Sequence, residues 1–362
     1  MTHHLFAFGS NGEGQLGIPA AEIVDTPVRV PVSIKLESLK SIRAGDNHSL
    51  LHLRNRSVHG AGDNRKGQLG YWIDNKTHLR GFELLLIAAD FIAATCETSA
   101  YVHIDSTTGL SWITTEGTAH WGELGCGDSV TSTALDGPDE THTLPEPLPG
   151  AVIDFAAGVW HYVAILADGS VFGWGKARLG QLGSTLTEKT TVPTKVEGIP
   201  FKPKKVVCGK DFSYFAGNPI SGEHIVLGKD KFGITSNKPE HIRGWKDIGA
   251  TWHAIFVLFA NGTLTAWGKD NMWQLLPPNL PPIDKIAIGS DHVLAVTRDN
   301  RLLSWGWGKH GNCGSLHNTM RDTHNDMLSG FWNEIDVPGR VDAVAAGYCT
   351  SFVLTRSPDA HA

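Results

Sequence analysis

The segment that decides the fold is Trp174-Gly-Lys-Ala-Arg-Leu-Gly-Gln-Leu-Gly183, in which an aromatic residue and a glycine are followed by a Leu-Gly pair. Related copies recur along the chain and can be counted by the glycine that follows the aromatic or small residue. These anchor glycines are Gly9, Gly62, Gly117, Gly175, Gly228, Gly268 and Gly306. Self-similarity at a spacing of some tens of residues is the signature of a repeat architecture. The sequence therefore predicts seven repeats.

A second element precedes most anchors. It is a short apolar run that ends in Ala-Gly, then two variable residues, then a histidine or hydroxyl residue that begins another apolar run. Its copies start at Ala44, Ala94, Ala157, Cys208, Gly249, Ile288 and Ala346. Turn residues such as Asp168-Gly169 lie between the two elements, flanked by alternating apolar residues, which predicts two-residue hairpin turns. Each repeat is therefore expected to be a β-meander of four short strands.

Short strands punctuated by glycine and aromatic residues favour an all-β fold, and their repetition is typical of a β-propeller. The chain starts with the second half of a repeat, residues 5–17, and ends with the first half, residues 341–355. We expect these N- and C-terminal strands to form one blade, which closes a seven-bladed ring without a free sheet edge at the join. Residues 1–362 are predicted to form a single domain, with a disordered tail at 356–362.

Composition restricts the function. The 31 basic residues are outnumbered by 37 acidic ones, and a net charge of −6 disfavours direct binding of nucleic acid. The five cysteines are scattered and never spaced Cys-x-x-Cys, which argues against a disulfide framework or a cysteine zinc site. The first residues lack the pattern of a secretory signal, and no apolar run is long enough to cross a membrane. We therefore expect an intracellular protein that does not bind membranes.

The Ala-Gly-x-x-His and Trp-Gly-x-x-x-x-Gly-Gln-Leu-Gly signatures resemble the regulator-of-chromosome-condensation repeat over essentially the whole chain. A closer resemblance is to the fungal killer-toxin-insensitivity, or alpha-tubulin suppressor, propellers. It rests above all on Trp305-Gly-Trp-Gly-Lys-His-Gly-Asn-Cys-Gly314. This resemblance implies a cytoplasmic and nuclear protein that forms a heterodimer with a small zinc-ribbon-like, metal-binding electron carrier. The pair would support diphthamide synthesis and the Elongator pathway of tRNA wobble-uridine modification.

Two other function classes were weighed against this one. The founding propeller of the repeat family is an exchange factor for a nuclear GTPase, so a guanine nucleotide exchange factor or another regulator of a small GTPase is the alternative. An enzyme is not expected, because the chain contains no G-x-S-x-G, H-E-x-x-H or phosphate-loop motif. We accordingly predict no catalytic residue, no cofactor and no metal held by this chain alone.

Four histidines, His48, His161, His253 and His292, are interpreted as occupying one repeat position. They could form a metal or proton-relay ring about the axis. The alternative is a structural role, in which each histidine fills its own blade and hydrogen-bonds to the backbone. We favour the structural role, because a repeated position is what a structural residue requires. Cys313, which replaces a core leucine, is predicted to be a small buried residue.

The two residues after each Ala-Gly vary between repeats, and they are expected to lie in turns that open on one face near the axis. Trp252 in such a turn is either an anchor for a protein partner or a side chain packed over the neighbouring blade. The loop 307–310 departs from the repeat and is expected to interact, whereas Trp305 is assigned to the core. The predicted partner-binding residues are Lys210, Asp211, Trp252, Ser290, Asp291, Trp307, Lys309 and His310.

Overall fold

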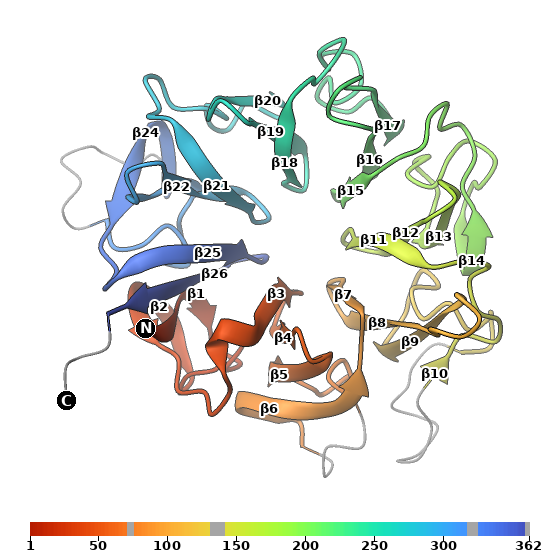
Figure 1. The fold of residues 1–362 in the computed structure, drawn as a ribbon, viewed down its shortest axis with the longest axis horizontal. Helices are drawn as coiled ribbons and strands as arrows, with labels where there is room; N and C mark the ends of the chain where they lie inside the picture. Colours follow the sequence, from red (N-terminus) through yellow and green to blue (C-terminus); the bar gives the residue numbers. More distant parts are fainter. Residues whose placement is uncertain (71–75, 131–141, 317–324, 359–362) are drawn as a thin grey trace.

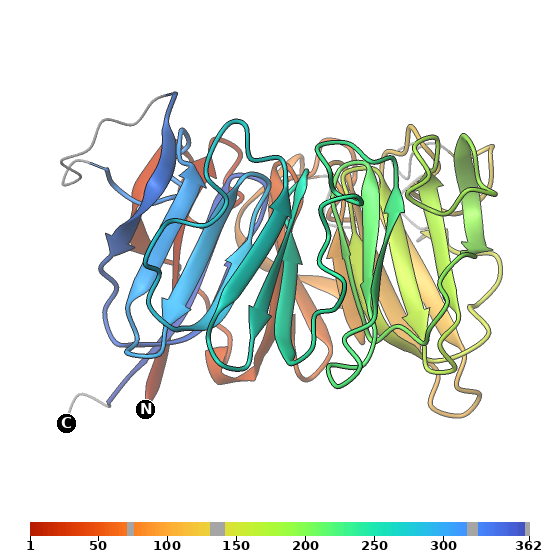
Figure 2. The same ribbon diagram turned by 90° about the horizontal axis from the view of Figure 1, so that it is seen from above.

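The computed structural model describes residues 1–70, 76–130, 142–316 and 325–358. Seven β-sheets stand around a common axis, and the first strand of each sheet lies nearest to it (Figure 1). Viewed from the side, the strands run between the two faces of a disc (Figure 2). The predicted all-β, seven-bladed propeller is confirmed.

We number the blades along the chain and give their strands from the axis outwards. Blade I consists of β3 (Leu39–Ala44), β4 (His48–Leu53), β5 (Ser57–Asp63) and β6 (His78–Ala88). Blade II consists of β7 (Phe91–Ala94), β8 (Thr98–Ile104), β9 (Ser111–Gly117) and β10 (His142–Thr143). Blade III consists of β11 (Val152–Ala157), β12 (His161–Leu166), β13 (Val171–Lys176) and β14 (Lys189–Lys195).

The next two blades have three strands each. Blade IV consists of β15 (Lys205–Cys208), β16 (Phe212–Ala216) and β17 (His224–Gly228). Blade V consists of β18 (Trp245–Ala250), β19 (Ala254–Phe259) and β20 (Leu264–Gly268). Blade VI consists of β21 (Ile283–Ile288), β22 (His292–Thr297), β23 (Leu302–Trp307) and β24 (Met327–Ile335). The expectation of four strands in every repeat is therefore wrong for blades IV and V, where the described chain forms no fourth strand.

Blade VII joins the two ends of the chain. It consists of β25 (Arg340–Ala346), β26 (Thr350–Ser357), β1 (Thr2–Asn11) and β2 (Ala21–Arg29). Strands β1 and β26 pair antiparallel from Thr2 opposite Ser357 to Gly9 opposite Thr350. The predicted closure of the ring is thus observed. The tail begins later than expected, because Arg356 and Ser357 still pair with β1; residues 359–362 lie outside the described part of the chain.

The repeat tryptophans lie in cores shared by neighbouring blades. Trp305 is fully buried, as predicted, and its indole N–H donates to the carbonyl of Leu275 in the preceding blade at 2.8 Å. Trp174 is likewise fully buried and donates to the carbonyl of Glu123 at 2.8 Å. Cys313 is also fully buried, and burial raises the pKa of its thiol, as expected for a small apolar residue. Each tryptophan therefore fills a core and ties two blades together.

Three of the four repeat histidines are buried links between blades. The Nε2 atom of His48 lies 3.0 Å from the hydroxyl of Ser99 in the next blade. His161 makes the same 3.0 Å contact with Ser213, and His292 makes it with Ser351. Burial lowers the pKa of His48 and His292 to about 4 and that of His161 to about 3, so these rings are neutral at neutral pH. The structural role is confirmed, but the partner is a serine of the next blade and not backbone of the same blade.

His253 does not belong to this set, and the interpretation of its position is wrong by one residue. Each inner turn is closed by a backbone N–H that donates to the carbonyl three residues later, as in Gly45 to His48. In blade V this bond runs from Thr251 to Ala254, so Ala254 occupies the histidine position. His253 is instead half-buried against the ring of Phe232, with ring centroids 5.3 Å apart. The prediction had aligned Gly249-Ala250 with the Ala-Gly start of the other turns, whereas Ala250-Thr251 occupies that place.

The hairpins differ slightly from the expected two-residue turns. In blade III the N–H of Leu166 donates to the carbonyl of Ser170, and the N–H of Gly169 donates to Leu166. Only Gly169 has a positive φ, of 94°, whereas a two-residue type I′ turn needs positive values at both central positions. The hairpin therefore has a three-residue loop that ends in a left-handed residue.

Candidate protein-binding face

Seven turns between first and second strands meet around one end of the axis. We call them the axial turns: Asp46-Asn47, Cys96-Glu97, Val159-Trp160, Lys210-Asp211, Trp252-His253, Ser290-Asp291 and Tyr348-Cys349. Backbone hydrogen bonds link most neighbouring turns. The N–H of Lys210 donates to the carbonyl of Trp252 at 2.9 Å, and the N–H of Trp252 donates to Ser290 at 2.9 Å. The variable turn residues therefore surround the mouth of the propeller, and backbone bonds hold most of them in place.

The loops that follow the third strands lie on the same face as the axial turns. In six of the seven blades an N–H at or just beyond the end of the third strand donates to the second residue of the axial turn in the same blade. Trp307 donates to the carbonyl of Asp291 at 2.8 Å, and Lys269 donates to that of His253 at 3.0 Å. We call this end of the disc the loop face. All the residues predicted to bind a partner belong to it.

Trp252 lies at the centre of the loop face in a cluster of three side chains. Its ring stands edge-on to that of Tyr348, with centroids 5.3 Å apart, and the Nζ atom of Lys210 lies 5.5 Å from its centroid. Tyr348 is buried, whereas Trp252 stays partly exposed and lines the axial opening. A part-exposed tryptophan beside a lysine offers both apolar area and charge to a partner.

The other predicted axial residues are brought to the same place, but two of them are used internally. Ser290 is only 6% exposed, and its hydroxyl donates to the carbonyl of Tyr348. The carboxylate of Asp211 accepts a hydrogen bond from Nζ of Lys176 at 3.0 Å. Burial raises the pKa of Asp291 to about 6, against the opposing effect of nearby lysines. Of the axial residues predicted to bind, Lys210 and Trp252 therefore present the most available side chains.

The loop 307–310 lies nearer the rim, beside blade VII. The rings of Trp307 and His310 meet edge-on with centroids 5.1 Å apart, and Lys309 is exposed. Burial, together with Lys309, lowers the pKa of His310. No described contact joins Trp307, Lys309 or His310 to Trp252 or Lys210, so the predicted residues form two separate groups on one face.

A group of lysines on blades IV and V was not recognised in the sequence. Nζ of Lys231 lies 5.2 Å from the centroid of Phe232, and Nζ of Lys269 lies 5.5 Å from it. Together with Lys210 over Trp252, these residues form what we call the basic-aromatic sector. None of its three lysines forms an ion pair with a described carboxylate. The recurrence of Gly-Lys-Asp after two anchors, at 228–230 and 268–270, was the available signal.

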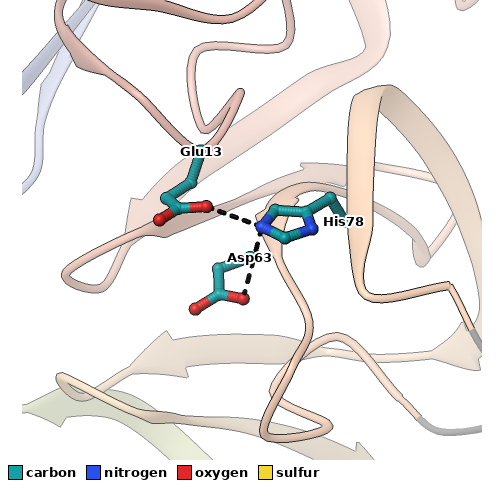
Figure 3. Close-up of side chains that lie close together, drawn as sticks. All are labelled: Glu13, Asp63 and His78. Carbon is teal, nitrogen blue, oxygen red and sulfur yellow. Dashed lines mark hydrogen bonds and ion pairs between the residues drawn. The ribbon is translucent and has the colours of Figure 1, made fainter.

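A second unrecognised group contains carboxylates and a histidine (Figure 3). Nε2 of His78 lies 2.6 Å from Oε2 of Glu13 and 3.9 Å from Oδ1 of Asp63. The three residues offer ligand atoms within 4.8 Å of one another, a spacing compatible with a metal ion. No sequence pattern predicted this group, because Glu13 belongs to blade VII and the other two residues belong to blade I.

Arg65 already supplies a cation to this acidic cluster. Its Nη2 atom lies 2.8 Å from Oε1 of Glu13, and its Nε atom lies 2.8 Å from Oδ1 of Asp63. Burial opposes ionisation of Asp63, but the hydrogen bonds from Arg65 outweigh burial and lower its pKa. Asp63 is thus ionised, and both carboxylates are paired with a guanidinium, so the cluster fits an ion-pair link between blades better than a metal site.

The axial channel has a cavity of about 360 Å³ lined by the innermost strands of the blades. Asp154 and Asp247 line it, but each accepts a hydrogen bond from backbone N–H, at 2.7 and 2.8 Å. Cys208 also lines the cavity, and burial raises the pKa of its thiol to about 12. This arrangement gives no activated nucleophile among the described lining residues.

The comparisons with known proteins agree with the fold. Family models described as the regulator of chromosome condensation (RCC1) repeat match residues 2–51 and 168–216, and residues 152–181 and 283–314. An RCC1 repeat-containing protein of Schizosaccharomyces pombe is 30% identical and is aligned over 97% of this chain and 98% of its own length. The chain belongs to the RCC1 repeat family. Among its relatives, RCC1-type propellers act as exchange factors and regulators.

Further RCC1-repeat relatives are more distant. A mouse secretion-regulating guanine nucleotide exchange factor is 26% identical over 86% of this chain and 75% of its own length. Human WBSCR16 has a TM-score of 0.79 at 18% identity, covering 98% of this chain and 100% of that one. Prp20p of Saccharomyces cerevisiae, studied for its binding to Gsp1p and histones, has a TM-score of 0.79 at 18% identity, covering 99% and 92%. At such identity the solved structures show the fold alone.

Among the described residues of this RCC1-repeat chain, no helix has the length and hydropathy needed to span a membrane.

Proposed function

We propose that the protein is a non-catalytic binding propeller whose loop face docks a protein partner. The observation that carries this proposal is the exposed part of Trp252 at the axial mouth, where it is supported by Tyr348 and Lys210. Binding energy at protein interfaces is concentrated in a few aromatic and cationic anchors. Backbone hydrogen bonds to the neighbouring turns hold Trp252 in place before binding, which lowers the entropy cost of docking.

A small GTPase is the partner class that we favour. Its support is the relatedness to a guanine nucleotide exchange factor over most of the chain, together with the fold shared with Prp20p, whose binding to Gsp1p has been studied. The unpaired lysines Lys210, Lys231 and Lys269 suit a partner that presents carboxylates, because opposite charges on two surfaces speed association. The protein would then regulate nucleotide release by the GTPase.

A small zinc-ribbon-like, metal-binding protein is the second candidate, with roles in diphthamide synthesis and Elongator-dependent tRNA modification. Its support is the resemblance of residues 305–314 to the killer-toxin-insensitivity propellers. The loop that carries it presents Trp307, Lys309 and His310 on the loop face. Any metal of such a heterodimer would belong to the partner. Under this proposal the protein would act in the cytoplasm and the nucleus.

Two assays with the purified chain distinguish the candidates. Release of a fluorescent GDP analogue from a Ran-type GTPase tests the first, and calorimetric titration with the zinc-ribbon protein tests the second. We expect Trp252→Ala to weaken binding of the true partner by about 2 kcal/mol, since it removes a central anchor. The matched control is Trp112→Ala, because Trp112 is 37% exposed and lies in β9, away from the axial turns. If neither protein binds, or both variants behave alike, the proposed docking face is wrong.

A further inference from the structure

Strand β20 is the outermost strand of blade V, although most blades continue with a fourth strand (Figure 1). We propose that its outer edge accepts an extended segment of another protein, which adds to the sheet as the missing fourth strand. This site runs along the outer edge of blade V and reaches the loop face only at its end beside Lys269, and strand addition does not require the partner proposed for that face. Addition of a strand to an exposed sheet edge is a common mode of peptide recognition.

The register of blade V shows which backbone groups face outward. The N–H of Phe259 donates to the carbonyl of Thr263 at 2.9 Å and so closes the hairpin between β19 and β20. Hydrogen-bonded and non-bonded pairs alternate from that point along an antiparallel ladder. Leu264 and Ala266, opposite Leu258 and Phe256, are therefore in non-bonded pairs with β19. Their N–H and C=O groups point away from β19, and no described group bonds to them.

Blade III shows which hydrogen-bond partners such outward backbone groups normally have. Its third strand, β13, has the same register, and the outward carbonyl of Val171 accepts a hydrogen bond from Val196 at 2.8 Å. The outward residue Gly173 pairs with Thr194 of β14. In this protein the backbone groups equivalent to those of Leu264 and Ala266 are thus satisfied by a fourth strand.

The chain's own connection after β20 is unsuited to be that strand. Only fourteen residues, 269–282, separate Gly268 from the start of β21, and four of them are prolines at 277, 278, 281 and 282. Proline has no N–H to donate and is excluded from paired central strands. Leu276 and Leu280 instead pack into the core shared by blades V and VI. The connection therefore packs against the core and does not pair with the outer edge of β20.

A groove lies at the loop-face end of the unpaired edge. Its cavity of about 760 Å³ is lined by residues 266–268 of β20, by residues 270–276 of the connection, by Ser329 of β24 and by Asn237 of the segment after β17. Met272 lies on the wall formed by the connection and is 52% exposed. Backbone donors and acceptors on one wall and apolar side chains on the other are what an extended peptide requires.

Blade IV provides an internal contrast, because its edge strand β17 is also unpaired. Both edges meet the chain's own connection at the hairpin, where the N–H of Ile242 donates to Gly222 at 3.0 Å and the N–H of Ile283 donates to Gly262 at 2.9 Å. In blade IV the connection also reaches the edge strand itself, because Nε2 of His224 in β17 lies 2.8 Å from the carbonyl of Pro239. No described bond joins the strand residues Leu264 and Ala266 to residues 269–282, so the edge of β20 is the better site for an added strand.

The charges around the groove indicate the chemistry of the added segment. An antiparallel fourth strand would start at the loop face, beside Lys269 and Lys231. The groove wall carries one described carboxylate, Asp270, close to these two lysines. The partner segment should therefore begin with acidic residues and continue with alternating apolar and polar residues, the apolar ones facing Met272 and its neighbours.

Amide hydrogen exchange tests the unpaired edge without any ligand. In the full-length protein, the amides of Leu264 and Ala266 should exchange at least about tenfold faster than that of Gly173, the equivalent of Ala266 in blade III, because the latter is paired. Equal protection of Ala266 and Gly173 would overturn the proposal, since it would mean that the edge of β20 is already covered.

Peptide binding tests whether an extended segment with an acidic start adds to the edge of β20. The probe is the labelled peptide Asp-Glu-Val-Thr-Val-Thr-Val, and its matched control carries the two acidic residues at the carboxyl end. We expect the first to bind at least about fivefold more tightly, because only its acidic end meets Lys269. On binding, exchange at Leu264 and Ala266 should slow. Equal affinities, or binding without protection of these amides, would contradict the proposed strand addition.

Two variants locate the peptide. Ala266→Pro removes an outward N–H that β19 does not use, and it should weaken binding at least about tenfold. Val226→Pro makes the matched change in β17 and should leave binding unchanged. If Ala266→Pro does not fold, as judged by its thermal melt, Met272→Glu replaces it, because like charges should weaken binding of the acidic peptide about fivefold. Unchanged affinity in the folded variant would refute the site.

Discussion

The acidic cluster and the basic-aromatic sector lie on the same face of the propeller but use their charges differently. In the cluster, Glu13, Asp63 and His78 are held close together, and Arg65 neutralises the two carboxylates. In the sector, lysines lie over the rings of Trp252 and Phe232, and no described carboxylate pairs with them. Charges that neutralise one another stabilise the blades they join. Charges that face only aromatic rings stay available to a partner.

The position of each region explains the difference. Glu13 belongs to the blade in which the two ends of the chain pair, and its contacts with Asp63 and Arg65 tie that blade to blade I. This ion-pair link stabilises the position of blade VII, which is itself held together by the pairing of the two chain ends. The basic-aromatic sector lies on blades IV and V, which do not contain this join. The same face therefore combines a structural part with a part suited to binding.

The largest effect is expected from breaking the ring beside the acidic cluster. Deleting residues 1–17 removes β1 together with Glu13, exposes the edge of β26 and takes Phe6 and Phe8 out of the core. We expect the truncated protein to aggregate, which size-exclusion chromatography and thermal melts would show. A soluble truncated protein with an unchanged thermal midpoint would mean that the join contributes little.

The next effect separates the core from the binding surface by comparing three tryptophans. Trp305→Ala should cost roughly 3–5 kcal/mol of unfolding free energy, because the fully buried indole leaves a cavity and an unpaired carbonyl. Trp252→Ala and Trp307→Ala should instead leave the fold intact and cost about 2 kcal/mol of partner binding. Denaturant melts and calorimetric titration measure the two quantities. A Trp252→Ala variant that is as unstable as Trp305→Ala would assign Trp252 to the core.

A smaller effect concerns Glu123, a buried carboxylate that forms no ion pair with a described cation. Glu123 is 1% exposed, and burial raises its pKa to about 7. It occupies the position of Gln181 and accepts the N–H of Trp121 at 2.8 Å, as Gln181 does from Leu179. A raised folded pKa means that stability falls as pH rises from about 4.5 to about 7. Glu123→Gln should remove that decline.

The gain from Glu123→Gln should be about 1–2 kcal/mol at pH 8 and close to zero at pH 4, where the carboxyl is protonated in both states. Denaturant unfolding at the two pH values measures it. The control is Glu83→Gln, since the Glu83 side chain is 40% exposed and its burial cost is correspondingly small. Equal gains at both pH values would show that the raised pKa of Glu123 is not the cause.

The smallest effect is expected within the acidic cluster itself. Arg65→Met should cost about 1 kcal/mol or less at neutral pH, because the Arg65 side chain is 52% exposed and water screens the pairs it makes. Arg65 lowers the folded pKa of Asp63, so its contribution is full above about pH 4 and is lost as pH falls through that lowered pKa. Thermal melts of both proteins from pH 7 to pH 2 should converge. A constant difference across this range would argue against the pairing.

Most of the fold was accessible from the sequence, because each blade is specified by short-range patterns. The anchor glycines predicted the number of repeats, and the structure explains why glycine stands there, since Gly175 and Gly306 have φ values of 101° and 100° within β13 and β23. The half-repeats at the two ends predicted the pairing of β1 with β26. Where the local pattern was ambiguous, as around His253, the prediction failed by one residue, because only backbone hydrogen bonding fixes the register of a turn.

Local patterns were enough to predict the number of blades and the assignment of Trp305 and Cys313 to the core, because each repeat carries its own strand and turn signals. The half-repeats at the two ends were enough to predict the closure of the ring. Which charges meet depends on the three-dimensional packing of the blades, since Glu13 and Asp63 belong to separate repeats that lie side by side. The tertiary structure also decided that β20 lacks an outer neighbour, because strand pairing depends on the path of the connecting chain in space.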